Sequence, residues 1–164
     1  MPLSTPVHTQ VANALKAVLA GITAGASYKY TPDRVGVSSF PVDAHLDRSA
    51  THVIVIRPGD EEDSEIATGQ QAQNLAEFFL VAARKVATTT EDPWSATEER
   101  RDEVASWMKR DILKALFADV TLGLGGTVCN IAVEPIRSQR RWHPEWSVIE
   151  LRLVADIRYT GTNP

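Results

Sequence analysis

The strongest constraint on the fold of this chain is a stretch near its C-terminal end, residues 147–159, in which apolar and polar side chains alternate. The apolar positions are Ile149, Leu151, Leu153, Ala155, Ile157 and Tyr159, and the polar ones include Glu150, Arg152, Asp156 and Arg158. A period of two predicts a β-strand with one buried face. Residues 127–136 alternate similarly, with Cys129, Ile131 and Val133 on one side. We therefore expect a half-buried antiparallel pair of strands.

Two other segments have the helical period. In the first helix, apolar residues recur at spacings of three and four: Val7, Val11, Leu15, Val18 and Ile22. We expect Thr5 or Ser4 to cap this helix and Pro6 to lie in its first turn, where a missing N–H donor costs nothing. The pattern predicts an amphipathic helix that ends at Gly21 to Gly25.

The second helix is expected after Pro93, with Thr97 as its cap and Glu98 and Glu99 in its first turn. Its apolar stripe consists of Val104, Trp107, Met108, Ile112, Leu116 and Phe117. A stripe of this kind is typical of a helix face packed on a core. The glycine-rich residues 122–126 follow, and we expect them to end the helix.

The middle of the chain is less regular. Residues 53–56 are apolar and β-branched, which predicts a buried strand, and Pro58-Gly59 predicts a turn after it. Residues 28–40 are interrupted by Pro32 and Gly36, and we interpret them as a loop and an edge strand. For residues 73–86 the helical and strand periods compete, and the pattern alone leaves both open.

Charge is concentrated in two short segments. The acidic run has Asp60, Glu61, Glu62, Asp63 and Glu65, and the basic linker of residues 137–146 has Arg137, Arg140, Arg141, Trp142 and Trp146. A run of carboxylates is expected on a solvated loop. Arginine and tryptophan are enriched at interface hot spots, and opposite patches on one molecule can join copies head to tail. The segments are therefore candidate subunit-interface loops, or both are simply solvated.

Composition narrows the class of protein further. The length of 164 residues suits a single domain spanning 1–164, and 17 Lys and Arg against 21 Asp and Glu give a net charge of −4. A mildly acidic chain disfavours nucleic acid as the main partner. No apolar stretch is long enough for a membrane span, and the N-terminus lacks the pattern of a signal peptide. We expect synthesis in the cytoplasm and no membrane partner.

Catalytic chemistry is not indicated by any motif. The four histidines, His8, His45, His52 and His143, are scattered and are expected on the surface or in turns. Cys129 is the sole cysteine and is expected to act as a small buried apolar residue. The acidic run lacks the spacing of a calcium loop. We therefore predict no catalytic residues, no cofactor and no metal, and a protein that is not an enzyme.

The order of these parts resembles the tail terminator and tail completion proteins of long-tailed bacteriophages. The resemblance covers nearly the whole chain and rests on element order and on short phrases of sequence. These are Val53-Ile54-Val55-Ile56-Arg57, residues 76–81, the helix of residues 102–117, Val120-Thr121-Leu122-Gly123 with Gly126-Thr127-Val128, and residues 151–159. An extra Leu124 and Gly125 lengthen the glycine break.

The resemblance implies an α/β fold of the α+β type, in which a mixed, mainly antiparallel sheet carries helices on one side. It also implies a strand at residues 73–86. Members of the family form rings, typically hexameric, that cap the tail tube, end its growth and join the tail to the head connector. The implied partners are copies of the chain itself, the tail tube protein and the head-tail connector protein, and genomic DNA passes through the lumen without sequence-specific binding. The implied location is the head-proximal end of the virion tail.

Other classes remain open at this stage. A different head-tail connector protein or a tail tube subunit would have a similar composition, and a small cytoplasmic ligand-binding or enzyme domain could assemble a site from dispersed residues. An acidic ring lumen, suggested by the run at Asp60 to Glu65, would repel DNA phosphates and ease their passage.

Overall fold

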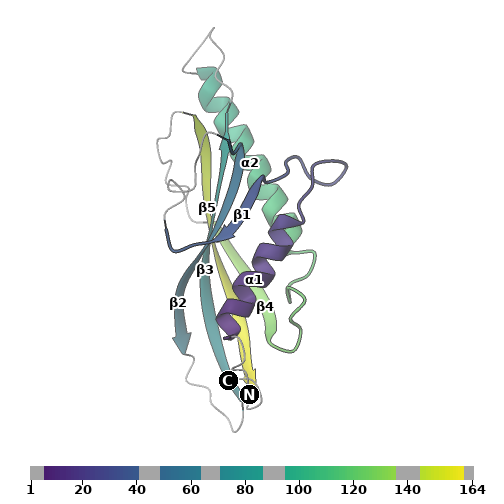
Figure 1. Ribbon diagram of the computed structural model, residues 1–164, viewed down its shortest axis with the longest axis vertical. Coiled ribbons are helices and arrows are strands. Elements are labelled where there is room, and N and C mark those ends of the chain that lie inside the picture. Colours follow the sequence, from purple (N-terminus) through teal and green to yellow (C-terminus); the bar gives the residue numbers. More distant parts are fainter. Residues whose placement is uncertain (1–5, 41–48, 64–70, 87–94, 136–144, 161–164) are drawn as a thin grey trace.

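The computed structural model describes residues 6–40, 49–63, 71–86, 95–135 and 145–160. In chain order, the elements are α1 (Val7–Ala20), β1 (Arg34–Val37), β2 (His52–Asp63), β3 (Gln71–Lys85), α2 (Ser95–Leu116), β4 (Val128–Pro135) and β5 (Trp146–Thr160). The five strands form one sheet in the order β1-β2-β3-β5-β4 (Figure 1). Only β1 and β2 pair in parallel. The sheet is therefore mixed and mainly antiparallel, as predicted.

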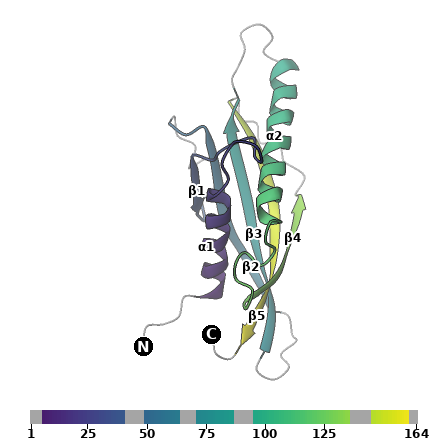
Figure 2. The same cartoon turned by 90° about the vertical axis from the view of Figure 1, so that its right-hand side faces the viewer.

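Both helices cover the same face of the sheet (Figure 2). Their apolar stripes meet the side chains that β2, β3 and β5 direct to that face, and together they form the main core. The largest fully buried side chains include Phe78 on β3, Leu15 on α1 and Met108 on α2. We call this side of the sheet the covered face and the opposite side the open face. The expectation of an α+β domain with helices on one side is confirmed.

The alternation that predicted β5 is present in the structure. Ile149, Leu151, Leu153, Ala155 and Ile157 are all buried on the covered face. The residues between them, from Val148 to Asp156, are half-buried on the open face. Because β5 lies between β3 and β4, its backbone groups are paired on both sides. Its one-sided burial therefore comes from its side chains alone.

Residues 73–86 are a strand, which resolves the ambiguity in the direction that the family resemblance implies. β3 pairs along its whole length with β5 and along most of it with β2. Its two faces are both partly apolar: Phe78, Leu80 and Ala82 enter the main core, while Val81 and Ala83 are buried on the open face. A strand that is apolar on both faces loses its period-two signal.

The predicted turn at Pro58-Gly59 is wrong, because β2 continues through both residues to Asp63. The pairing of β2 with β3 shifts register between Pro58 and Glu61, which marks a bulge. Ser38 donates its N–H to the Ile56 carbonyl at 2.9 Å, so by alternation the nitrogen of Pro58 faces the side of β2 where β1 has already ended. Proline therefore removes no bond from the β2–β3 ladder. Asp60 to Asp63 belong to a strand and not to a loop.

Both helix starts differ from the predictions. Pro6, and not Thr5 or Ser4, occupies the N-cap of α1, and no side chain caps this end. α2 begins at Ser95, so Thr97 lies within its first turn. At the other end of α2, Phe117 follows the helix with 52% of its surface exposed and is no part of the core. The predicted stripe is therefore correct for Val104, Met108, Ile112 and Leu116, whereas Trp107 is only half-buried and Phe117 is exposed.

A tight turn follows α2, as the glycine-rich segment predicts. The carboxylate of Asp119 accepts the N–H of Thr121 at 2.9 Å and the N–H of Gly123 at 2.8 Å. The hydroxyl of Thr121 also donates to it, and this bond is the main reason that the pKa of Asp119 is lowered. Leu122 and Gly123 have φ values of 55° and 73°, a region that favours glycine.

β4 contains a second bulge that changes the position of Cys129. Val128 pairs with Ile157 and Asn130 with Asp156, so Cys129 is the extra residue. The bulge places Val128 and Ile131 together in the main core, although a strict period of two would separate them. Cys129 is half-buried, and the prediction of a buried cysteine on an apolar face is wrong.

Candidate interaction surfaces

The candidate interface residues from the sequence lie mostly outside the described part of the chain. Five of them lie outside the described residues: Glu65, Arg137, Arg140, Arg141 and Trp142. Asp60, Glu61, Glu62 and Asp63 form the end of β2, beyond the last residue of β1. The proposed contact between an acidic loop and a basic loop therefore stays a prediction, and only the backbone of its acidic part is located.

Trp146 was grouped with the basic linker, and this assignment is wrong. It is the first residue of β5, has 4% of its surface exposed, and packs in a second apolar cluster on the open face. The other buried members of this cluster are Ala50, Val53, Val55, Val81 and Ala83. The sequence signal for this cluster is the continuous apolar run of residues 53–56, which supplies side chains to both faces.

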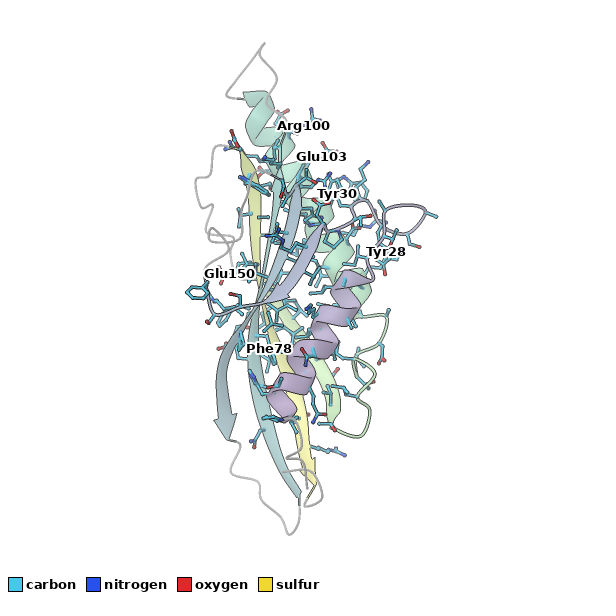
Figure 3. All side chains as sticks on the ribbon, viewed as in Figure 1. Tyr28, Tyr30, Phe78, Arg100, Glu103 and Glu150 are labelled. Carbon is cyan, nitrogen blue, oxygen red and sulfur yellow. The ribbon has the colours of Figure 1, made fainter. Side chains whose placement is uncertain are left out.

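The open face also carries a row of ion pairs that the sequence analysis missed. The guanidinium of Arg152 on β5 contacts the carboxylate of Glu77 on β3 and donates to Glu134 Oε2 on β4 at 3.0 Å. Arg57 on β2 lies 3.6 Å from Glu150 on β5, which Figure 3 shows on the side of the sheet away from α1. The hydrogen bonds to the carboxylates of Glu77 and Glu134 raise the pKa of Arg152. Cross-strand charges on one face of a sheet stabilise its pairing.

The absence of a side chain at Gly59 leaves space for the carboxylate of Glu77, a member of this row. An added Cβ at Gly59 would lie 2.9 Å from Glu77 Oε2. One carboxylate oxygen of Glu77 therefore lies against Gly59 of β2, and the other contacts Arg152 of β5 on the opposite side of β3. Arg57 nearby lies over the ring of Phe79, 5.2 Å from its centroid. The row is thus a packed polar surface on the open face.

A polar cluster lies at the other end of the molecule, under the loop that joins α1 to β1. The buried carboxylate of Asp111 on α2 accepts the N–H groups of Lys29 and Tyr30 at 2.8 and 2.9 Å. The Tyr30 ring lies against the guanidinium of Arg84, 3.9 Å from its centroid. Figure 3 shows Tyr30 close to Arg100 and Glu103 of α2. Burial is the main cause of the raised pKa of Tyr30.

Two histidines are not the surface residues that the sequence analysis predicts. His52 on β2 is 2% exposed and makes an edge-to-face contact with Tyr30. Burial lowers the pKa of His52 to about 4, and the charge of Arg84 adds to this effect. His8 on α1 stacks on Phe78 at 4.5 Å between ring centroids. His45 and His143 lie outside the described residues.

Hydrogen bonds to two aspartates, one buried and one exposed, hold elements together. The contacts of Asp111 join the α1–β1 loop to α2, and Asp33 accepts the N–H groups of Thr51 and His52 at 2.7 and 2.8 Å. Among the described residues, no three His, Cys, Asp or Glu side chains could hold a metal ion together. In the same residues, no helix is long and apolar enough to span a membrane.

Comparisons with known proteins find a similar fold but no similar sequence. No protein-family model and no curated protein matches the sequence. Among solved structures, the chain is similar to the sheath/tube terminator of PVC, an extracellular contractile injection system, in its extended state. The TM-score is 0.50 at 10% identity, and the match covers 98% of this chain and 58% of that chain. The likeness is one of fold, and this chain spans less than two thirds of that protein's length.

Proposed function

We propose that this protein is a terminator of a tail-like particle, whose copies form a ring that caps the tube and ends its growth. The observation that carries the proposal is the likeness in fold to a sheath/tube terminator over 98% of this chain. The order of helices and strands, read from the sequence alone, leads to the same class.

In the finer form of the proposal, the particle is a bacteriophage. The ring is hexameric, lies at the head-proximal end of the tail, and binds the tail tube protein on one side and the head-tail connector protein on the other. Genomic DNA passes through its lumen. The protein acts by shape and self-association and is not an enzyme. Its partly exposed row of ion pairs on the open face supports a role in contacts between proteins.

The test uses the purified full-length protein. Light scattering coupled to size exclusion, with negative-stain microscopy, is expected to give rings of about six copies. Adding the rings to growing tubes of the tube protein from the same particle should stop elongation, so that mean tube length no longer rises with time. A protein that stays monomeric at all concentrations, or one that polymerises into tubes itself, would contradict the proposal.

A second experiment tests the predicted loop contact. Replacing Arg140, Arg141 and Trp142 with Ala should weaken self-association and leave the far-ultraviolet circular dichroism unchanged. Lys16→Ala, at an exposed position on α1, serves as the control and should leave assembly unaffected. Intact assembly of the triple variant would refute a contact through the basic linker, and the ring proposal would stand.

A further inference from the structure

The two edges of the sheet have complementary geometry. Within the described part of the chain, β1 and β4 are the outermost strands, and each pairs with a neighbour on one side only. Following the pairings across the sheet, β1 runs parallel to β2, β2 and β5 run in the same direction, and β4 runs opposite to β5. β1 and β4 are therefore antiparallel. Copies arranged head to tail would bring the β1 edge of one beside the β4 edge of the next in the antiparallel orientation.

The backbone groups that point outward can be assigned on β1. The N–H of Ser38 bonds to Ile56 on β2, and strand backbone groups alternate in direction. Gly36 therefore faces β2, and Val35 and Val37 direct their N–H and C=O groups away from the sheet. Val37 is also 39% exposed, and Phe40 just beyond it is 66% exposed, so this edge presents apolar surface.

The same assignment holds for β4. Arg158 on β5 donates its N–H to the carbonyl of Thr127, so by alternation the backbone of Asp156, Val154 and Arg152 also faces β4. Their partners on β4 are Asn130, Ala132 and Glu134. Ile131 and Val133 therefore direct their N–H and C=O groups outward. The bulge at Cys129 and the donor-free Pro135 limit the free edge to about the length of β1.

We propose that β1 of one copy pairs with β4 of the next copy, in an antiparallel register that places Arg34 opposite Glu134. In this register, Val35 meets Val133 and Val37 meets Ile131, and these are the outward-facing residues on both strands. The side-chain faces match as well, because Val133 and Ile131 share the covered face with Val35. The proposal rests on the proposed ring and names the contact that builds it.

Two details of the open face support this register. Arg34 and Glu134 have opposite charge and are both exposed, so Glu134, which already accepts from Arg152, would lie between two guanidinium groups. Gly36 lies opposite Ala132, and a shallow hollow beside Gly36 has Val53 and Val55 among its lining residues. A small side chain from the next copy fits this place. Opposite charges and close apolar pairs across strands each favour pairing.

Disulfide trapping tests the register. We would replace Cys129 with Ser and combine Gly36→Cys with Ala132→Cys. A Cβ at Gly36 meets no atom within 4 Å, so the substitution is compatible with the fold. Gly36 and Ala132 would form a non-hydrogen-bonded pair with Cα atoms about 4.5 Å apart, within the range of a disulfide. Mild oxidation of the assembled protein should give a ladder of covalent oligomers on a non-reducing gel.

Matched controls make the result specific. Gly36→Cys with Asn130→Cys shifts one cysteine by two residues to a diagonal position about 7–8 Å away, and should cross-link at least roughly tenfold more slowly. Each single variant alone should give no dimer, and an equal mixture of the two should give dimers. Dimers of Gly36→Cys alone would indicate a two-fold contact through β1 and would overturn the proposal.

The outcomes separate this inference from the proposed function. Rings in negative stain without cross-links, or with equal cross-linking in the shifted control, would overturn the β1–β4 contact and leave the ring intact. Protein that is monomeric before oxidation would overturn both. Cross-links that form in assembled rings, and that do not form when the protein is diluted to monomers before oxidation, would support both.

Discussion

The covered and the open faces of the sheet are made by the same strands and differ in what surrounds them. Phe78 and Phe79 are neighbours on β3, yet Phe78 is fully buried against α1 and Phe79 is half-buried beneath Arg57. On the covered face, the helices and the sheet bury most apolar side chains between them. On the open face, burial is divided between an apolar cluster near Trp146 and the ion pairs of Arg152. The comparison indicates that one face is an apolar core along its length, whereas the other combines a smaller core with a polar surface.

The comparison predicts its largest effect at the two phenylalanines. Phe78→Ala should lower the free energy of unfolding by about 3–5 kcal/mol, because it leaves a cavity in the main core. Phe79→Ala should cost about 1–2 kcal/mol, because less apolar area returns to water. Urea unfolding followed by circular dichroism measures both. Equal losses would show that the open face is as tightly packed as the covered one.

The apolar cluster of the open face gives the next effect. Trp146→Ala should lower the free energy of unfolding by about 3 kcal/mol, because the side chain is almost fully buried. The matched control is Trp107→Ala on α2, whose half-buried ring lies between Lys29 and Arg110 and should lose less. A loss at Trp146 no larger than that at Trp107 would contradict the assignment of a second core.

Lowering the pH should weaken the covered face near His52. The pKa of His52 is about 4 in the fold, against 6.5 as its ordinary value. Between these values the unfolded chain binds a proton that the folded chain does not, so stability falls as pH decreases from 6.5 to 4 and is unaffected by His52 above 6.5. The full effect is about 3 kcal/mol.

The variant His52→Gln isolates this contribution, because carboxylates also titrate in the same range. The difference in unfolding free energy between the wild type and His52→Gln should change with pH between 6.5 and 4, and it should be constant from 7 to 8. A difference that is independent of pH would mean that His52 titrates normally in the folded protein.

The smallest effect is expected in the ion-pair row. Arg152→Met should lower stability less than either Trp146→Ala or Phe78→Ala, because exposed pairs contribute little. The loss should shrink as salt is added. A double-mutant cycle with Glu134→Gln measures the coupling. A loss that is insensitive to salt would indicate that the methylene groups of Arg152 matter more than its charge.

The helices and strands that are amphipathic could be predicted from the sequence. The secondary structure of an element with apolar side chains on both faces could not. The alternation in β5 and the stripes of α1 and α2 were sufficient, because one face of each meets water. β3 is apolar on both faces, so its pattern suited a helix equally well. The extension of β2 through Pro58 depends on the early end of β1, and pairing between distant segments is not encoded in local pattern.

The interaction surfaces were even less accessible from the sequence. Glu77, Glu134 and Arg152 come from three strands, and only the strand order β3-β5-β4 brings them together. Each of the three is a polar residue in its strand segment, but the sequence does not indicate which residue of another strand it contacts. The charged runs can be recognised in the sequence because their residues are consecutive. One face of a sheet is instead built from every second residue of several strands, so its residues are scattered along the sequence.

The continuation of β2 past the end of β1 gives each subunit a polarity along its long axis. Asp60, Glu61, Glu62 and Asp63 extend the strand at one end of the sheet, whereas β4 runs in the other direction and ends at the opposite end. Two rings stacked with their β2 ends facing would bring like charges together, and like charges repel. A tube capped by such rings would thus distinguish its two directions, and a second ring could not add in the inverted sense without an energetic penalty.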